Sequence, residues 1–289
     1  MKPKDYRFNG KRPLVLDQAS TEASDKIKDM KDELVQRTEE NIEQIGKLQE
    51  RLYADGREGL VIVLQAMDAA GKDSTIKHVM TGLNPQGVDV YSFKAPTVNE
   101  LKHDFLWRIG KCLPEKGKIA IFNRSHYEDV LAVGVLKLYE NFALPARCPA
   151  DQLIEKRMRS IVDFEQYLYD SGIRMMKIFL HVSKDEQKKR LLERIDRPEK
   201  NWKFDAGDLK ARAMWDKYQK AYEDTINATA TKHCPWYVIP ADDKWFARYL
   251  VSEAVLDTLD KMNPQYPELG EDEAAALPAL RAQLMDEAE

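Results

Sequence analysis

The sequence predicts an α/β fold in three layers: a five-stranded parallel sheet with helices on both faces, and a helical lid. Short apolar runs rich in β-branched residues alternate along the chain with longer amphipathic stretches, which is the pattern of strands and crossover helices. Turns that contain Gly and Pro separate these segments. The clearest run covers residues 60–64, which are all apolar, as expected of a strand buried on both faces of a parallel sheet.

The composition excludes several classes of protein. The chain has 289 residues, of which 43% are hydrophobic, so it is long enough to bury a large core. Its net charge is −4, whereas a protein that binds nucleic acid is usually basic, so we expect no nucleic-acid partner. No apolar run approaches ~20 residues and no apolar leader opens the sequence, which predicts a cytoplasmic protein without a membrane partner. The three cysteines are too widely spaced for a zinc site.

The first 55 residues predict an arm followed by a helix. Residues 1–20 are polar and contain proline, so we expect them to lie extended on the body. From residue 20 to residue 53, apolar side chains recur at steps of three and four among many charges, which predicts an amphipathic helix, broken once, that ends at Asp55-Gly56 and covers one face of the sheet. The expected division is residues 1–55 as arm and docking helix, 56–265 as core with a lid at about 184–210, and 266–289 as an acidic tail.

The remaining elements follow in order after the strand at residues 60–64 and the turn at residues 84–87. Strands are expected where apolar residues cluster between turns, and helices where they recur at helical spacing. We expect a strand at 88–93, a helix at 97–113, a strand at 118–122, a helix at 150–170, and strands at 173–182 and 236–239.

A candidate phosphate cradle follows the strand at residues 60–64. Small residues lead to Lys72 and then to a helix, so backbone N–H groups and the positive end of the helix dipole would face an anion. Asp68 inside this loop would repel a phosphate unless a metal ion lies between them, which favours phosphoryl transfer over simple anion binding. The alternative is an ordinary strand-to-helix turn that contains a lysine. Besides Lys72, the expected phosphate ligands are Ala69, Ala70, Gly71, Asp73, Ser74 and Thr75.

The loop matches the P-loop pattern GxxxxGK[ST] only in part. Ala66 stands where the first glycine belongs, and Asp73 stands where the Ser or Thr that binds magnesium belongs. Ser74 and Thr75 follow one and two places later. The pattern therefore leaves open how a metal ion would be held.

Two further segments are expected at the same edge of the sheet. Lys94 follows the second strand, and Asn123 and Arg124 follow the third, so their side chains would converge on the phosphate loop if the strands are parallel. Lys94 is alternatively a solvated loop lysine. Glu128 is a candidate metal ligand with Asp68, or else a carboxylate that stabilises the start of a helix.

A basic stripe after the fourth strand predicts the lid. Like charges at helical spacing repel each other, and nearby carboxylates are too few to neutralise them, so we expect phosphates to do so when the lid closes. The alternative is a solvated basic face with Glu193 and Glu199 as partners. The stripe consists of Arg190, Arg194 and Arg197 on a helix that Pro198 ends, and of Lys200 and Lys203 beyond it.

Four segments together resemble the polyphosphate kinase 2 family: QAMDAAGKDSTIKHV, NPQGVDVYSFKAPT, IFNRSHYEDVL and ERIDRPEKNWKF. The resemblance extends from about Leu14 to about Asn263. It implies a P-loop kinase-like three-layer sandwich with a helical lid, and magnesium-assisted in-line transfer of phosphate between inorganic polyphosphate and nucleotides. The FNRSHYE form resembles the branch that phosphorylates both nucleoside mono- and diphosphates, so AMP and ADP are the expected acceptors.

The resemblance also implies roles for single residues. Asp68 would be the catalytic carboxylate of the loop, Lys72 its phosphate lysine and Arg124 the catalytic arginine of the second motif. Many members have Asp where this chain has Asn123, so the resemblance leaves the metal ligands and the preferred acceptor open. From the residues themselves, Asp68 and Glu128 are the expected metal ligands, with Asn123 as a further candidate. Mg²⁺, or alternatively Mn²⁺, is the expected cofactor, and a homodimer or homotetramer the expected assembly.

Two other functions remain open. An ATP-dependent nucleoside monophosphate kinase would share the fold, but would be expected to have Ser or Thr where Asp73 stands. A non-catalytic module that binds polyanions would bind tightly without turnover, and the acidic net charge argues against it. Activity with polyphosphate as the only phosphate donor separates the three.

Overall fold

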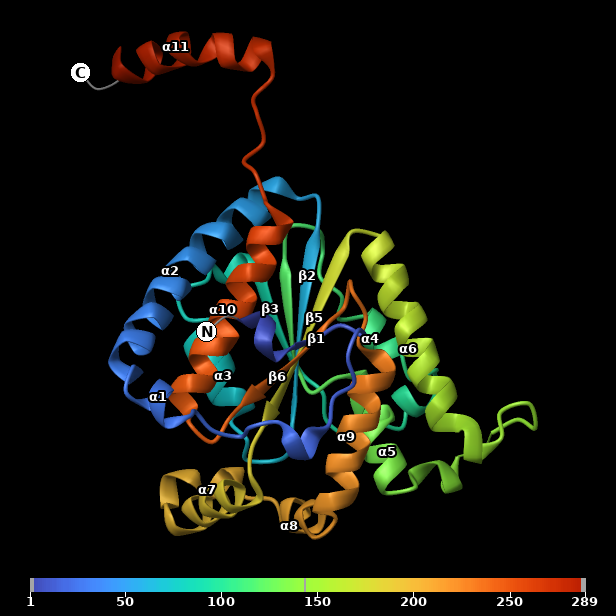
Figure 1. Ribbon diagram of the computed structural model, residues 1–289. Helices are drawn as coiled ribbons and strands as arrows, with labels where there is room; N and C mark the ends of the chain where they lie inside the picture. The colour runs from blue at the N-terminus through green and yellow to red at the C-terminus, as the bar shows by residue number, and fades with distance from the viewer. Residues whose placement is uncertain (1–2, 143, 287–289) are drawn as a thin grey trace.

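A six-stranded sheet lies at the centre of the computed structural model, which describes residues 3–142 and 144–286 (Figure 1). The order of the strands is β1-β6-β5-β2-β4-β3, and all neighbours are parallel except β1 and β6. The strands are β1 (Arg7–Phe8), β2 (Gly59–Ala66), β3 (Val88–Ser92), β4 (Ile119–Asn123), β5 (Ile173–His181) and β6 (Trp236–Pro240).

Strand β2 lies in the interior of the sheet and is buried along all of its residues. It is parallel to β4 on one side, with Leu64 opposite Asn123, and to β5 on the other, with Ala66 opposite Leu180. Because helices cover both faces, β2 needs apolar residues on both sides, which explains its unbroken apolar run. The carboxyl ends of β2, β4 and β5 therefore meet at one edge of the sheet.

The predicted five-stranded parallel sheet is wrong in its count and in its uniform direction. All five expected strands are present, but β1 adds a sixth, antiparallel strand, in which Arg7 pairs with Tyr237 and Phe8 with Trp236. Two residues are too few to show a periodic pattern, so the sequence carries no signal for this strand. The arm is held to the sheet edge by main-chain hydrogen bonds.

Helices cover both faces of the sheet (Figure 1). Helices α2, α3 and α10 lie on one face, and α5, α6 and α9 lie on the other. The predicted break in the first long amphipathic segment is confirmed, because α1 and α2 are separate and α2 ends at Asp55, before Gly56 at φ +63°. The helices on these two faces are α1 (Asp25–Lys28), α2 (Lys31–Asp55), α3 (Lys72–Val79), α5 (Leu131–Val135), α6 (Leu153–Asp170), α9 (Trp215–Thr229) and α10 (Lys244–Met262).

The predicted helix at residues 97–113 is wrong. This segment forms only a 3₁₀ turn at Glu100–Lys102 and the single turn α4 (Trp107–Gly110). The Asp104 carboxylate accepts a hydrogen bond from the Leu106 N–H at 2.9 Å, so a local turn replaces the helix there. The other 3₁₀ turns are Pro3–Tyr6, Leu16–Gln18, Pro85–Gly87, His126–Asp129, Leu138–Asn141, Ala150–Gln152 and Pro198–Lys203.

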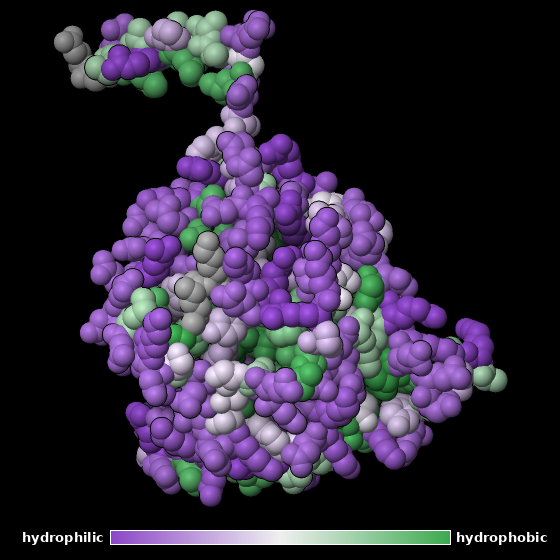
Figure 2. Space-filling view, in the orientation of Figure 1, coloured by the Kyte–Doolittle hydropathy of each residue, from purple (hydrophilic) through white to green (hydrophobic). Residues whose placement is uncertain are grey.

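Helices α7 (Lys184–Asp196) and α8 (Ala206–Ala213) lie beyond the carboxyl edge of the sheet, whereas α11 (Glu271–Asp286) stands apart at the opposite end (Figure 1). Hydrophilic side chains dominate the surface of the body in Figure 2. Among the described helices, none is long and apolar enough to cross a membrane. The proposed division into arm, core and tail stays a prediction, and residues 1–2 and 287–289 of the arm and tail lie outside the described part of the chain.

Candidate active site

The candidate phosphate loop, residues 67–71, connects β2 to α3 in a strained conformation. Ala69 adopts φ +62° and Gly71 adopts φ +108°, both in the left-handed region. Only glycine enters this region at low cost, so Gly71 suits its position, and Ala69 stores strain. No side chain of the described residues caps the start of α3 at Gly71, so its first backbone N–H groups remain available to an anion.

Lys72 lies under this loop and is buried. Its Nζ donates a hydrogen bond to the carbonyl oxygen of Ala66 at 3.1 Å. Burial and the nearby charge of Arg124 lower the pKa of Lys72 to about 8, although Asp68 and Glu128 partly offset this. A phosphate that reaches Lys72 would therefore meet a positive charge that the surrounding carboxylates neutralise only in part.

Arg124 belongs to the turn after β4 and contacts two carboxylates. Its backbone has φ +62°, and its N–H bonds to the Leu64 carbonyl oxygen at 3.0 Å, which ties the turn to β2. Its guanidinium contacts the Asp68 carboxylate and lies 3.4 Å from Glu128 Oε1. Burial opposes its charge, but Glu128 and Asp68 together raise its pKa. The structure thus brings together three of the residues that the sequence singles out.

The oxygen donors near Arg124 suit a hard cation in part. Asp68 and Glu128 present carboxylates on either side of the guanidinium. In the described part of the chain, no group of three or more His, Cys, Asp or Glu residues is arranged to hold a metal ion. Mg²⁺ takes one or two carboxylates and completes its shell with water and substrate phosphates, so these two residues fit it only together with a phosphate ligand.

Asn123 forms a hydrogen bond with Asp73. Its Nδ2 donates to Asp73 Oδ1 at 2.9 Å, at the start of α3. Although burial raises the pKa of Asp73, the Asn123 amide and Lys203 bring it below its usual value. Asn123 therefore acts on the phosphate loop through Asp73. Its hydrogen bond to Asp73 does not support a role as a metal ligand beside Asp68.

The other predicted loop residues have mixed surroundings. Thr75 is buried in α3, whereas the Ser74 hydroxyl accepts a hydrogen bond from Arg248 at 3.0 Å. Lys94 is exposed after β3, and its carbonyl oxygen accepts a hydrogen bond from Arg108 at 2.8 Å. The predicted role of its side chain in binding phosphate stays a prediction.

Arg190 anchors α7 to the phosphate loop. It is buried, and its guanidinium donates to the carbonyl oxygens of Ala70 at 2.7 Å and Ala241 at 2.7 Å. It also pairs with Glu186 at 2.8 Å. Because its donors are engaged by the backbone, Arg190 joins the base of the lid to the loop, which differs from the free phosphate ligand expected from the sequence.

The expected shortage of carboxylates around the rest of the basic stripe is wrong. Each cation has an acidic partner. Glu193 and Glu199, the partners named in the alternative interpretation, pair with Arg197 and Lys200, whereas the partners of Arg194 and Lys203 come from other elements. Arg197 also lies just past the end of α7, in extended backbone. The pairs are Arg194 with Asp208 at 2.8 Å, Arg197 with Glu193 at 3.1 Å and Glu199 at 2.5 Å, Lys200 with Glu193 at 2.5 Å, and Lys203 with Asp73 at 3.4 Å.

Sequence reasoning missed Asp208 and Gln187. Asp208 is buried on α8, and burial together with the charge of Asp68 raises its pKa to about 6, against the opposing effect of Arg194. Gln187 donates from Nε2 to the Asp68 carbonyl oxygen at 3.0 Å. An acidic residue near the start of a helix is ordinarily explained by the helix dipole, so no local signal distinguishes Asp208 as part of the site.

Comparisons with known proteins identify relatives of this chain. The family model described as polyphosphate kinase 2 matches residues 27–267. The chain is 48% identical over 246 residues to the ADP-polyphosphate phosphotransferase of Rhodopseudomonas palustris, covering 84% of this chain and 85% of that one. It is 51% identical over 222 residues to the AMP/ADP-polyphosphate phosphotransferase of Meiothermus ruber, covering 77% and 79%. The crystal structure of polyphosphate kinase 2 from Arthrobacter aurescens is similar with a TM-score of 0.87 and 36% identity, over 99% of this chain and 97% of that one.

Single substitutions of Arg190 and Arg194 should distinguish the anchoring role of Arg190 from the ligand-binding role predicted for Arg194. Arg190→Ala should lower the free energy of unfolding by about 3–5 kcal/mol, because it leaves several buried carbonyl oxygens without their donor and leaves Glu186 with only the exposed Lys189 as a partner. Arg194→Ala should lower it by less, about 1–3 kcal/mol, because Asp208 has a raised pKa and can take up a proton when its partner is lost, and the variant should bind tripolyphosphate more weakly. Thermal unfolding and calorimetric titration measure the two effects. Equal stability losses would contradict the distinction.

Asn123→Asp should make stability depend on pH. The new carboxylate would lie where the amide now donates to Asp73, so two negative charges would repel at neutral pH. Sharing a proton relieves this repulsion, so the melting temperature should approach that of the wild type as the pH falls from 8 to 5, and Mg²⁺ should partly substitute for acid. Asn123→Ala removes the hydrogen bond without adding charge and serves as the control. The same pH-independent deficit in both variants would show that Asn123 and Asp73 do not interact as described.

Proposed function

This chain belongs to the polyphosphate kinase 2 family, and we propose that it transfers a phosphoryl group between inorganic polyphosphate and AMP or ADP. The relatives from Rhodopseudomonas and Meiothermus are named for transfer with ADP and with AMP or ADP, respectively. We further propose that the enzyme works in the cytoplasm as a homodimer or homotetramer.

One observation carries the proposal: cations from the loop, the sheet edge and the lid converge around the uncapped start of α3. Lys72 begins this helix, and Arg124 reaches the loop through Asp68. From the lid, Lys203 reaches Asp73, which lies in the first turn of α3. A chain of phosphates is the ligand whose repeated negative charges match such an extended set of donors.

The residues support in-line displacement through alignment and neutralisation of charge. A terminal phosphate oxygen of the nucleotide attacks the end phosphorus of polyphosphate, and the bond to the next bridging oxygen breaks. The attacking oxygen is already largely ionised at neutral pH, so no strong base is required. Lys72 and Arg124 would stabilise the charge on the transferred group, and the lid would exclude water as Arg194 and Lys203 exchange their carboxylates for phosphates.

We propose Mg²⁺ as the metal ion, held by Asp68 and Glu128 together with substrate phosphates. When bound, it would neutralise charge on the phosphate oxygens and polarise the bond to phosphorus. For either carboxylate to bind it, Arg124 must release that carboxylate and turn toward the phosphates instead. Mn²⁺ has similar ligand preferences and is the alternative.

The phosphate donor that the enzyme accepts distinguishes this function from that of an ATP-dependent kinase. The wild type should form ADP and ATP from AMP or ADP with polyphosphate as the only donor. Lys72→Ala and Asp68→Asn should each lower kcat/KM by about 10²–10³-fold, as when one preorganised charged or hydrogen-bonding group is removed. Lys261→Ala changes an exposed lysine at the far end of α10 and should have no effect. Turnover with ATP and AMP but none with polyphosphate would overturn the proposal, and tight binding without turnover would indicate a binding module.

The pKa of Lys72 predicts how polyphosphate binding responds to pH. In the free enzyme this lysine is charged below about pH 8 and neutral above it. The KM for polyphosphate should therefore rise as the pH increases through 8, while kcat changes less, because a bound phosphate raises the pKa of Lys72. Lys72→Arg keeps its charge in this range and should abolish the rise. A KM with the same pH profile in both enzymes would assign the titration to another group.

A further inference from the structure

Gln65 is a buried polar residue of β2 that the proposed mechanism does not use. It lies one residue before Ala66, near the start of the phosphate loop, and its exposed fraction is 0%. A buried amide is stable only when its oxygen and nitrogen both find partners. Its contacts therefore reveal what the surrounding structure requires at this position.

The orientation of the Gln65 amide follows from its neighbours. With the oxygen toward Ser125, it accepts hydrogen bonds from the Ser125 hydroxyl at 3.1 Å and the Ser125 N–H at 3.1 Å. Its Nε2 then donates to Glu128 Oε1 at 3.0 Å. The opposite orientation keeps a single bond, from Nε2 to the Ser125 hydroxyl, so the first orientation is the satisfied one.

Glu128 transmits this contact to the active site. Its Oε1, which receives the Gln65 hydrogen bond, also lies 3.4 Å from Arg124 Nη1. The other arm of the guanidinium contacts Asp68. Gln65 therefore fixes the carboxylate against which Arg124 is oriented. It also holds Ser125, the residue that directly follows the strained backbone of Arg124.

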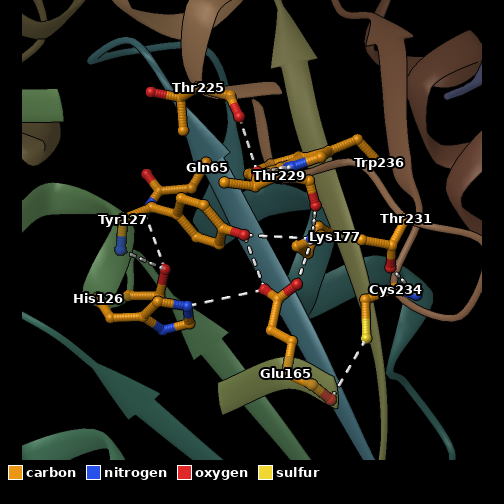
Figure 3. A network of polar contacts seen from close by, with 11 residues as sticks. Gln65, His126, Tyr127, Glu165, Lys177, Thr225, Thr229, Thr231, Cys234 and Trp236 are labelled. Carbon is orange, nitrogen blue, oxygen red and sulfur yellow. Dashed lines mark hydrogen bonds and ion pairs between the residues drawn. The ribbon is translucent and has the colours of Figure 1, made fainter. Parts of the chain in front are cut away.

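A buried network supports the same turn from below (Figure 3). The Tyr127 hydroxyl donates to Glu165 Oε1 at 2.7 Å, and Lys177 Nζ donates to Glu165 Oε2 at 2.5 Å and to the Thr229 carbonyl oxygen at 2.8 Å. Burial opposes the charge of Glu165, but the nearby charges of Lys177 and His126 lower its pKa. The turn is thus fixed at Tyr127 by α6 and β5, and at Ser125 by β2.

We propose that Gln65 is a positioning residue for phosphoryl transfer, acting through Glu128 on Arg124. This inference rests on the proposed function. The Gln65 amide fixes the Glu128 carboxylate, against which Arg124 is oriented before it releases that carboxylate and turns toward the transferred phosphate. The charged groups around it are Glu128 and Arg124 after β4, Asp68 after β2, and the Glu165–Lys177 pair of α6 and β5.

Gln65→Glu tests this role because it preserves shape and changes the hydrogen bond. The introduced carboxylate cannot donate to Glu128 when it is ionised and repels it, whereas its protonated form donates as the amide does. The kcat of the variant should be about 10–100-fold below wild type at pH 8, in the range seen when a partner of an active-site ligand is lost. The deficit should shrink as the pH falls to 6, with little change in the KM for polyphosphate.

Three comparisons keep the result interpretable. Gln65→Leu cannot regain a donor, so its loss of kcat should not depend on pH. Gln49→Glu alters another buried glutamine, which bonds the Asn84 N–H at 3.0 Å outside the site, and should leave kcat unchanged. If Gln65→Glu does not fold, Glu128→Gln combined with Gln65→Leu should lower kcat by less than the product of the two single effects.

The outcomes distinguish this inference from the function on which it rests. A wild type without polyphosphate-dependent turnover would refute the proposed function and the positioning role together. An active wild type with an unaffected Gln65→Glu, or with the same deficit at every pH in Gln65→Glu and Gln65→Leu, would refute the positioning role alone. Melting temperatures measured in parallel ensure that each rate is taken on folded protein.

Discussion

The parallel register of β2 and β4 is the constraint on which the candidate site depends. Leu64 lies opposite Asn123, so both strands end at the same level of the sheet. The chain that leaves β2 forms the phosphate loop, and the chain that leaves β4 forms the turn that carries Arg124. A slip of one residue would turn every side chain of the strand to the other face and would separate Arg124 from Asp68.

The site combines a loop and a turn that buried contacts hold in place with a partly exposed ion pair between Lys203 and Asp73. Ala69 and Arg124 both hold backbone conformations that cost about 1–3 kcal/mol each in non-glycine residues, so neighbouring contacts must impose them. Buried hydrogen bonds and the Glu165–Lys177 pair provide that constraint below the site. Above it, Lys203 is joined to Asp73 by a partly exposed ion pair, which contributes little and is easily exchanged for a phosphate.

Local patterns in the sequence were sufficient for most of the fold and for the centre of the site. The apolar run of β2 predicts a buried strand, which the structure confirms, whereas the anion site that the small residues before Lys72 predict stays a prediction at an uncapped helix start. The contacts of the lid were not predictable in this way, because Arg194 pairs with Asp208 on another helix, and Arg190 binds carbonyl oxygens, which every residue possesses. Pairing between distant segments depends on how elements pack, and periodicity contains no information about it.

The short strand β1 has a consequence for how the chain is made. Arg7 pairs with Tyr237, so β1 is synthesised well before the strand with which it pairs. Until β6 is complete, the apolar strand β5 forms an open edge of the growing sheet, and such edges readily pair with other chains. Strand β1 can cover the edge of the sheet only after β6 has paired with β5.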